Sequence, residues 1–221
     1  MEGRYPKALL FALTEPNDLA KRGEFDTWYR RIHIPDVTTG GIWNHAIQFT
    51  NTSAKPGEGY SLVTYETGME PDEANKAMRA ASQTRGDDRR FAPGMKGIGA
   101  GTFKRIGGEH RARVGRPVCG VMAVVANCDP AREAEFNRWY DDVHLLDIME
   151  TGAFHTAYRY ESTDVATTGG KYLAIYESEY EPAKAREIMA PRIPKLREMG
   201  RVFDGMKSVR SFSGNRVWPA E

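Results

Sequence analysis

The sequence predicts an α+β fold in which one βαββαβ unit occurs twice. Residues 24–71 match residues 135–182 at a constant offset of 111 positions, and fifteen of the 48 aligned pairs are identical. Chance would give about three identities at ordinary residue usage. Apolar runs, helical stripes and turn residues also follow one another in the same order in both copies. Each half has about 110 residues, which is enough to bury a modest core.

The unit begins with a strand and a helix. Residues 8–13 and 118–126 are short apolar runs that end in polar and turn-forming residues, which is typical of buried strands. Phe25, Trp28 and Ile32 then follow at the spacing of one helical face. The second copy repeats that spacing with Phe136, Trp139 and Val143.

Two strands, a second helix and a last strand complete the unit. Residues 42–49 are rich in aromatic side chains, and residues 60–66 follow a glycine-rich turn as their antiparallel partner. A glutamate–proline pair then precedes a helix over residues 72–82, and a strand covers residues 98–106. In the second copy we expect the same elements at residues 153–160, 171–177, 183–199 and 203–212.

The order βαββαβ is that of a ferredoxin-like unit, an antiparallel sheet with two helices on one face. A single copy leaves the other face of its sheet uncovered. We therefore expect two ferredoxin-like repeats packed sheet to sheet as an α+β barrel. The first repeat is placed at residues 1–106, a polar and basic linker at 107–117, and the second repeat at 118–221.

A motif that both copies share supports this fold. It consists of Phe25, Trp28, Tyr29, His33 and Asp36 in the first copy, and of Phe136, Trp139, Tyr140, His144 and Asp147 in the second. The motif resembles the dimeric α+β barrel superfamily, in particular its EthD-like members, and the resemblance covers nearly the whole chain. That superfamily includes muconolactone isomerases, polyketide cyclases, cofactor-free monooxygenases, and haem-binding peroxidase and chlorite dismutase relatives. The resemblance implies the fold, but a fold does not select one of these functions.

Composition excludes several classes of partner. The net charge is +1 and the charged residues are mixed in sign, so no surface for nucleic acid is expected. No apolar run approaches the ~20 residues of a membrane span. Cys119 and Cys128 belong to no CxxC motif and no Cys/His cluster, which indicates a reduced, cytoplasmic compartment. The helical His–Asp pairs supply two ligands each where a metal site usually needs three or four, so no metal ion is expected. Because the chain already contains two repeats, we expect a monomer or a homodimer, with no cofactor.

His33 and His144 are the first candidates for catalysis. Pro35 disfavours helical geometry just before it, so His33 is expected in the last turn of its helix. The helix dipole favours a charged histidine there, and Asp36 or Asp147 can hold the imidazole ring. The alternative is a structural role, in which both histidines simply end their helices.

A second candidate site lies on the strand after this helix. Trp43, His45, Ile47 and Phe49 alternate along residues 42–49, so they would form one aromatic face with a single polar group. Such a face is typical of a small-molecule pocket, although core packing explains its aromatic residues equally well. By the same alternation, His155 of the second copy should point to the opposite side of its sheet.

Three further features differ between the copies or lie near the histidines. Arg30 and Arg31 correspond to Asp141 and Asp142, which gives the two sites different electrostatics unless these residues are simply solvent-exposed. Residues 83–97 form a loop without a counterpart; it either closes over a ligand through Arg89 or serves only as a connection. Tyr65 and Tyr176 end the third strand of each unit, where they either orient a substrate or pack over the rim.

These observations predict a cofactor-independent enzyme that moves protons on a small aromatic or polyketide-like compound, as a lyase, isomerase or cyclase. His33, His45 and His144 are the candidate acids and bases, oriented by Asp36 and Asp147. The candidate substrate-binding residues are Trp28, Tyr29, Trp43, Trp139, Tyr140, His155, Tyr65, Tyr176 and Arg89. The alternatives are a non-catalytic, small-ligand-binding or stress-associated barrel and, third, a cofactor-free oxygenase. A haem site would need an axial histidine, which the second copy offers without the flanking residues of the haem-binding members.

Overall fold

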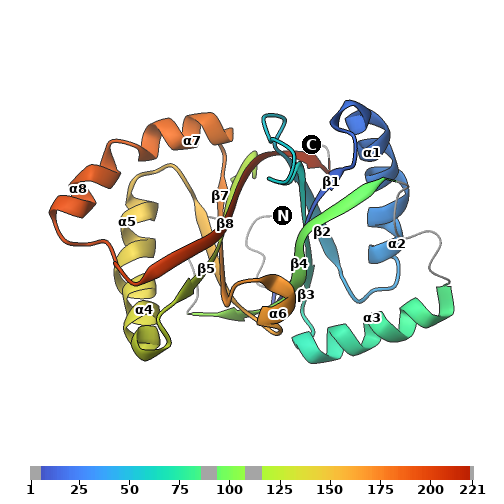
Figure 1. Cartoon of the computed structure of the whole chain (residues 1–221), viewed down its shortest axis with the longest axis horizontal. Coiled ribbons are helices and arrows are strands. Elements are labelled where there is room, and N and C mark those ends of the chain that lie inside the picture. Colours follow the sequence, from blue (N-terminus) through green and yellow to red (C-terminus); the bar gives the residue numbers. More distant parts are fainter. Residues whose placement is uncertain (1–5, 86–93, 108–115, 220–221) are drawn as a thin grey trace. The chain divides into compact units, whose positions relative to one another are not determined.

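The chain is described from a computed structural model that places residues 6–85, 94–107 and 116–219. It divides into two compact units, which we treat separately (Figure 1). Of the described residues, the unit called the first repeat contains 6–85 and 94–105, with the short segments 162–168 and 216–219. The second repeat contains 106–107, 116–161 and 169–215.

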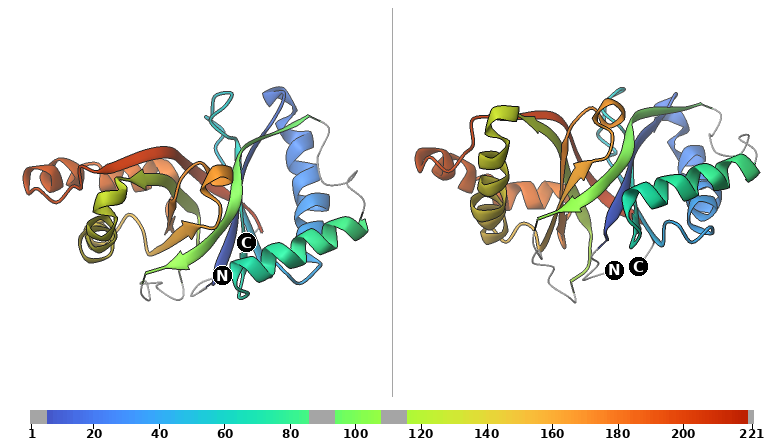
Figure 2. Two further views of the ribbon diagram at one scale, coloured as in Figure 1. Left: turned by 60° about the horizontal axis from the view of Figure 1, so that its bottom comes forward. Right: turned by 90° about the horizontal axis from the view of Figure 1, so that it is seen from below.

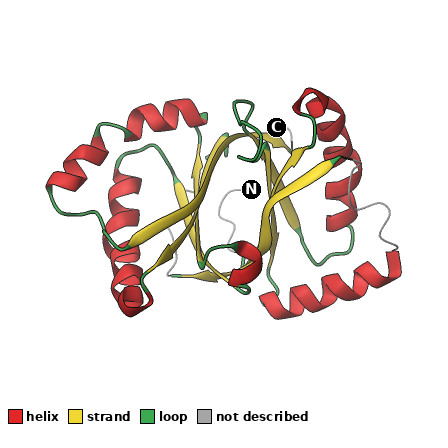
Figure 3. Cartoon of the chain, in the orientation of Figure 1, coloured by secondary structure: helices red, strands yellow, loops and turns green. Residues whose placement is uncertain are grey.

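The first repeat is a four-stranded antiparallel sheet with its helices on one face (Figures 1 and 3). In sheet order the strands are β4 (Met95–Ile106), β1 (Ala8–Pro16), β3 (Ser61–Thr67) and β2 (His45–Thr50). The helical segments are η1 (Leu19–Lys21), α1 (Arg22–Trp28), η2 (Tyr29–His33), α2 (Ile34–Thr38) and α3 (Pro71–Arg85). The element order is therefore the predicted βαββαβ.

The second repeat has the same construction. Its strands, in sheet order, are β8 (Met206–Trp218), β5 (Gly120–Cys128), β7 (Tyr172–Ser178) and β6 (Thr156–Ser162). Its helical segments are η4 (Pro130–Arg132), α4 (Glu133–Trp139), η5 (Tyr140–His144), α5 (Leu145–Glu150), α7 (Pro182–Met189) and α8 (Arg192–Glu198). A further short helix, α6 (Val165–Thr168), groups with the first repeat.

The strand registers place equivalent residues at equivalent points of the two sheets. Tyr65 on β3 is paired with Leu10 on β1 and with Ala46 on β2. Tyr176 on β7 is paired with Met122 and Ala157 in the same way. Each tyrosine belongs to a core cluster between the sheet and the helices of its own repeat, together with the aromatic residues of the shared motif.

The first helix does not end near His33, as Pro35 had led us to predict. Residues Tyr29–His33 form a π turn, in which the amide of Ile34 donates to the carbonyl of Tyr29 five residues earlier. The helical run then continues through α2, with Pro35 in its first turn, where a missing amide costs little. Residues 22–38 thus form one continuous helical run, which is blue in Figure 2. His33 lies inside this run, so the dipole argument for a charged ring does not hold.

Two other boundaries also differ from prediction. The second helix of the second repeat was expected to be continuous, but it breaks after Met189, and Pro191 caps the start of α8. Strand β2 begins only at His45, so the alternation of its side chains does not extend back to Trp43. Trp43 instead packs with Ala46 in the core beneath the helices.

Candidate functional site in the first repeat

A cavity of about 530 Å³ lies within the first repeat, between its sheet and its helices. Its wall is largely apolar and includes Leu10 and Ala12 from β1 and Met78 from α3. A volume of this size is typical of small-molecule and cofactor sites, which are usually lined in this way. The polar side chains on the wall are Thr14, Tyr29, His33, Asp36, Thr39, Trp43 and Tyr65.

His33 reaches the cavity wall from the π turn. Its ring stacks on the Trp28 ring, with 4.7 Å between centroids, and meets the Tyr29 ring edge-on at 5.0 Å. The π turn widens the helix at this point, and such turns are frequent at functional sites. Trp28 itself lines a separate hollow of about 360 Å³ with residues around the start of α1. The histidine is thus fixed by two aromatic rings and presented to the cavity.

The tyrosines of the wall are buried and remain protonated at neutral pH. Burial raises the pKa of Tyr29 to about 12, although a long hydrogen bond from the Thr14 hydroxyl, at 3.5 Å, opposes this. Burial and the nearby Tyr29 raise the pKa of Tyr65 well above its ordinary value. Both side chains are therefore neutral phenols that can donate a hydrogen bond.

Two side chains of this wall carry a buried polar atom that lacks a partner among the described residues. The hydroxyl of Tyr65 and the indole Nε1 of Trp43 are buried and make no hydrogen bond. Each side chain is only 1% exposed. A buried donor without an acceptor is uncommon in proteins and usually has a functional or structural cause.

The second repeat fills the equivalent space. Its two tyrosines, Tyr140 and Tyr176, bond to each other with 2.9 Å between hydroxyl oxygens. The ring of His144 stacks on the Trp139 ring with 4.6 Å between centroids, and the Phe203 ring also stacks on Trp139, at 5.5 Å. The same motif residues thus form a packed cluster here and a cavity wall in the first repeat.

Asp147 and Asp36 show the same contrast. Asp147 is buried, and Arg201 binds both of its carboxylate oxygens, at 2.7 and 2.9 Å. The carbonyl of Arg201 also accepts a hydrogen bond from Trp139 Nε1 at 2.8 Å. Asp36 is exposed and lies at the edge of the cavity. Sequence analysis missed Arg201 and Phe203 because they lie beyond the gap-free part of the repeat.

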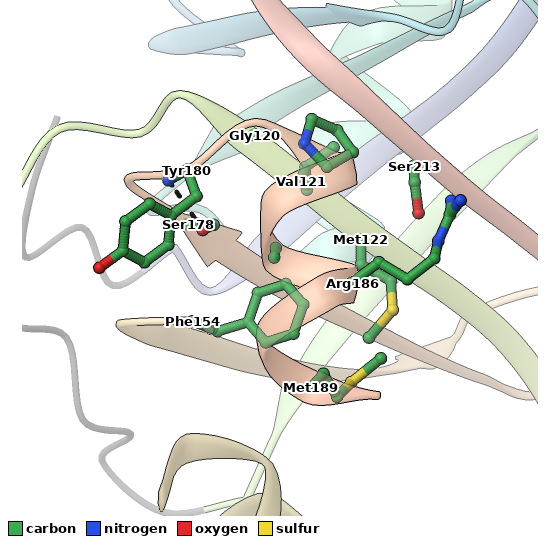
Figure 4. Close-up of a pocket in the computed structure, with 11 residues that line it drawn as sticks. Gly120, Val121, Met122, Phe154, Ser178, Tyr180, Arg186, Met189 and Ser213 are labelled. Atoms are coloured by element: carbon green, nitrogen blue, oxygen red, sulfur yellow. Dashed lines mark hydrogen bonds between the residues drawn. The ribbon is translucent and has the colours of Figure 1, made fainter. Parts of the chain in front are cut away.

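A pocket in the second repeat is much smaller (Figure 4). It has a volume of about 30 Å³, which is about the share of one water molecule in the liquid. Figure 4 shows Phe154, Met122 and Met189 beside it, next to helix α7. This pocket does not contain the predicted histidines.

The charge reversal beside the histidines has a local cause. Arg30 donates to Gln48 on β2 at 3.0 Å and also contacts Asp26 at 3.3 Å. At the equivalent position of β6, the buried Arg159 donates to Asp141 at 2.9 Å. The arginine therefore lies on the helix in the first repeat and on the strand in the second, and the alternative that Arg30 and Asp141 are simply solvent-exposed does not hold.

Most of the predicted site residues fall into two groups, one in each repeat. Tyr29, His33, Asp36, Trp43 and Tyr65 all line the first-repeat cavity. His144, Asp147, Trp139, Tyr140 and Tyr176 are packed in the second repeat, and Trp28 lines the other hollow. Arg89 lies outside the described residues.

His45 and His155 do not take the predicted positions in a pocket. His45 is exposed at the start of β2 and is not on the cavity wall, because Trp43 precedes the strand and the expected alternating face does not form. His155 is 4% exposed and its ring nitrogens contact the Thr156 hydroxyl at 2.8 Å and the Pro117 carbonyl at 3.0 Å. Sequence analysis missed Thr14, Met78 and Met95 on the wall, since only the folded sheet and α3 bring them to the motif.

Chlorite dismutases share this fold. A candidate chlorite dismutase has 10% identity over 95% of this chain and 94% of its own, with a TM-score of 0.57. A chlorite dismutase variant from Candidatus Nitrospira defluvii has 9% identity over 97% of this chain and 93% of its own, with a TM-score of 0.57. A candidate monooxygenase from Lactobacillus acidophilus has 12% identity over 97% and 94%, with a TM-score of 0.50. No protein-family model and no curated protein sequence matches the chain.

This likeness runs over both repeats and confirms the predicted fold class, an α+β barrel of ferredoxin-like repeats. It does not single out the EthD-like members. Among the residues that the structure places, no helix is long and apolar enough to cross a membrane. Within the same ranges, no group of three or more His, Cys, Asp or Glu side chains is arranged to hold a metal ion.

The same neighbours overturn the predicted function. A cofactor-independent lyase, isomerase or cyclase was expected, and that prediction is wrong because the fold neighbours are chlorite dismutases and a candidate monooxygenase. They do not favour the non-catalytic barrel or the cofactor-free oxygenase either. The structure gives a second argument against histidine acid–base catalysis at His144. Burial lowers the pKa of this ring to about 4, so it is not a base poised near neutrality.

Proposed function

We propose that this chain is a haem-binding enzyme of the oxidoreductase type, with its haem in the first-repeat cavity. The structures that share its fold include chlorite dismutases, and the superfamily that its sequence resembles includes haem-binding relatives of that enzyme. The observation that carries the proposal is the cavity of about 530 Å³ with His33 on its wall.

The residues on the cavity wall fit a bound haem. Haem iron is held in proteins by histidine, tyrosine, cysteine thiolate or methionine side chains. His33 is the histidine that lines the cavity, and its two aromatic contacts fix the plane of its ring. Leu10 and Met78 contribute apolar surface of the kind that a macrocycle buries. The exposed residues Thr39 and Gly40 give polar groups of a bound molecule access to water.

Bound haem would supply one-electron and oxygen chemistry that amino-acid side chains lack. The chain's own contribution is to hold the group through His33 and to exclude water with the apolar wall. Tyr29 and Tyr65 would not serve as phenolate ligands, because burial raises the pKa of both hydroxyls.

The test is a titration of the purified full chain with hemin, followed by its absorption spectrum. We expect saturable binding at one hemin per chain. His33→Ala should weaken binding by at least about tenfold and change the spectrum, since it removes the proposed ligand. His45→Ala is the matched control, because His45 is exposed and lies off the cavity wall. Non-saturable binding, or equal spectra for His33→Ala and the natural chain, would overturn the proposal.

The relation to the EthD-like members is also a proposal. Its support is the shared motif, whose first copy brings Tyr29, His33 and Asp36 onto one cavity wall. The expected oligomeric state, a monomer or a homodimer, stays a prediction, and sedimentation velocity would check it.

A further inference from the structure

A hollow of about 360 Å³ in the first repeat lies outside the proposed haem cavity. Its wall includes two aromatic side chains, Phe25 and Trp28, and three charged side chains, Asp18, Lys21 and Glu24. None of these five residues lines the cavity of about 530 Å³. We call this space the Trp28 hollow, and the proposed function makes no use of it.

The second repeat fills the equivalent position with an aromatic ring of its own. At the offset of 111 residues, the two rings of the hollow become Phe136 and Trp139. The Phe203 ring packs on both, with 5.7 and 5.5 Å between centroids. The guanidinium of Arg132, which stands at the position of Lys21, lies over the same ring at 4.4 Å. One phenylalanine ring thus contacts the equivalents of three wall residues.

This ring also completes a stack of three in the second repeat. His144 and Phe203 both stack on Trp139, at 4.6 and 5.5 Å between centroids. In the first repeat His33 stacks on Trp28 at 4.7 Å. Within the described ranges no second ring stacks on Trp28, whose other ring contacts are tilted or edge-on. The first repeat therefore has two members of the stack and a hollow where the third would lie.

The basic residue of the hollow favours a ligand with an acidic group. In the second repeat Arg132 binds the carboxylate of Asp204, which directly follows the packed phenylalanine, at 2.6 Å. Arg132 also binds Glu135, the equivalent of Glu24, so an acid at this position does not exclude a second carboxylate. Lys21 is exposed and forms no ion pair with a described residue.

The third charged residue of the wall has a local role. The carboxylate of Asp18 accepts a hydrogen bond from the amide of Ala20 at 2.9 Å, which caps the start of the helical run. Asp129 accepts from Ala131 in the same way and at the same distance. The feature that remains to meet a charged ligand group is therefore Lys21.

We propose that the Trp28 hollow binds a small aromatic carboxylate, with its ring against Trp28 and Phe25 and its carboxylate at Lys21. Phe203 and Asp204 supply these two groups in the second repeat. The ring would supply most of the affinity, because stacking and apolar burial contribute more than an exposed ion pair. The lysine would supply the preference for an acid. This binding does not depend on haem in the other cavity.

The test is equilibrium dialysis of the full chain against 2-naphthoate and 2-naphthamide, which share a ring system and differ in charge. We expect one saturable site per chain that prefers the acid. Trp28→Leu should weaken the binding of both probes by about tenfold or more, since it removes the stacking surface. Lys21→Gln should lower the preference for the acid about threefold and leave the amide unaffected. Lys195→Gln, at an exposed position of α8, is the matched control.

Two further variants locate the site. Ala12→Phe places a ring in the proposed haem cavity and should leave naphthoate binding unchanged, because Ala12 does not line the Trp28 hollow. Phe203→Ala removes the ring that covers Trp139 and should raise the number of naphthoate sites from one to two per chain. Melting curves establish that each variant folds. If Phe203→Ala does not fold, the variants of Trp28 and of the exposed Lys21 decide the question.

Several results would overturn the inference. They are the absence of saturable binding to the natural chain, equal binding by Trp28→Leu, and an acid preference that Lys21→Gln leaves unchanged. The chain also has a candidate ring of its own, because Phe91 and Phe203 both precede a glycine–methionine–lysine triplet, although Phe91 lies outside the described residues. Naphthoate binding that appears only in Phe91→Ala would assign the hollow to that residue and so contradict the proposal.

Hemin titrations of the same variants keep the two proposals apart. A chain that binds naphthoate at the Trp28 hollow and does not bind hemin retains this inference alone. A chain that binds hemin through His33 and does not bind naphthoate retains the proposed function alone.

Discussion

The hydroxyl oxygens of Tyr140 and Tyr176 lie 2.9 Å apart in the second repeat, within a packed aromatic cluster. The equivalent residues of the first repeat, Tyr29 and Tyr65, line a cavity, and Tyr65 makes no hydrogen bond to a described residue. One sequence motif thus produces a closed core in one repeat and an open wall in the other. The difference comes from residues outside the motif, such as Phe203, which packs against Phe136 and Trp139.

The tyrosine pairs predict opposite effects of the same substitution. Tyr176→Phe should lower the free energy of unfolding by about 1–2 kcal/mol, because it leaves the buried hydroxyl of Tyr140 without its partner. Tyr65→Phe should leave stability unchanged or raise it slightly, since it removes an atom that is already unsatisfied. Urea denaturation of both variants gives the comparison. Equal destabilisation would mean that Tyr65 has a bond that the structure does not show.

The different position of the arginine, on the helix in the first repeat and on the strand in the second, predicts a rescue. Arg159→Gln should destabilise the chain by about 2 kcal/mol, because the buried guanidinium binds both Asp141 and Asn137. Adding Asp141→Arg recreates the arginine–glutamine pair that Arg30 and Gln48 form in the first repeat. We expect the double variant to regain at least half of the lost stability in a double-mutant cycle. Strictly additive losses would show that the two positions are not coupled.

His144 predicts a pH dependence of stability. Its pKa is lowered from 6.5 to about 4 in the folded chain, chiefly by burial. The unfolded chain therefore binds a proton that the folded chain does not between these two values. Stability from this group is present above pH 6.5 and is lost as the pH falls towards 4, by at most about 1.4 kcal/mol per pH unit.

This dependence can be assigned with two variants. The free energy of unfolding is measured at several pH values between 4 and 7 for His144→Gln and for His45→Gln, whose ring is exposed. His144→Gln should flatten the slope in that range, and His45→Gln should leave it as in the natural chain. A slope that survives in His144→Gln would assign the titration to another group.

The internal repeat made most of the fold predictable. The offset of 111 residues aligns both helices and all but the last strand of each unit. A helix or strand that is poorly marked in one copy can therefore be located from the other copy. What failed were local details that depend on backbone hydrogen bonds. Pro35 fits within the helical run because the π turn before it shifts the backbone hydrogen bonds by one residue. No periodicity in the sequence reveals such a turn.

The site was predictable only in part for a similar reason. The motif identified Tyr29, His33 and Asp36, which do share one wall. It could not show that their equivalents are packed, because Phe203 and Arg201 reach the second cluster from beyond the aligned region. His45 was misplaced because the alternation argument assumed a strand that begins before Trp43, whereas pairing begins at His45.

The most direct test of the account asks whether the first-repeat cavity is where hemin binds. Ala12 lies on its wall, so Ala12→Phe places a ring in the cavity, whereas Ala166→Phe adds the same ring at an exposed position of α6. With both variants shown to be folded by circular dichroism, hemin titrations are compared with that of the natural chain. The account predicts that Ala12→Phe loses saturable hemin binding and that Ala166→Phe keeps it. Equal hemin binding by both variants would contradict the account, because the group would then bind elsewhere.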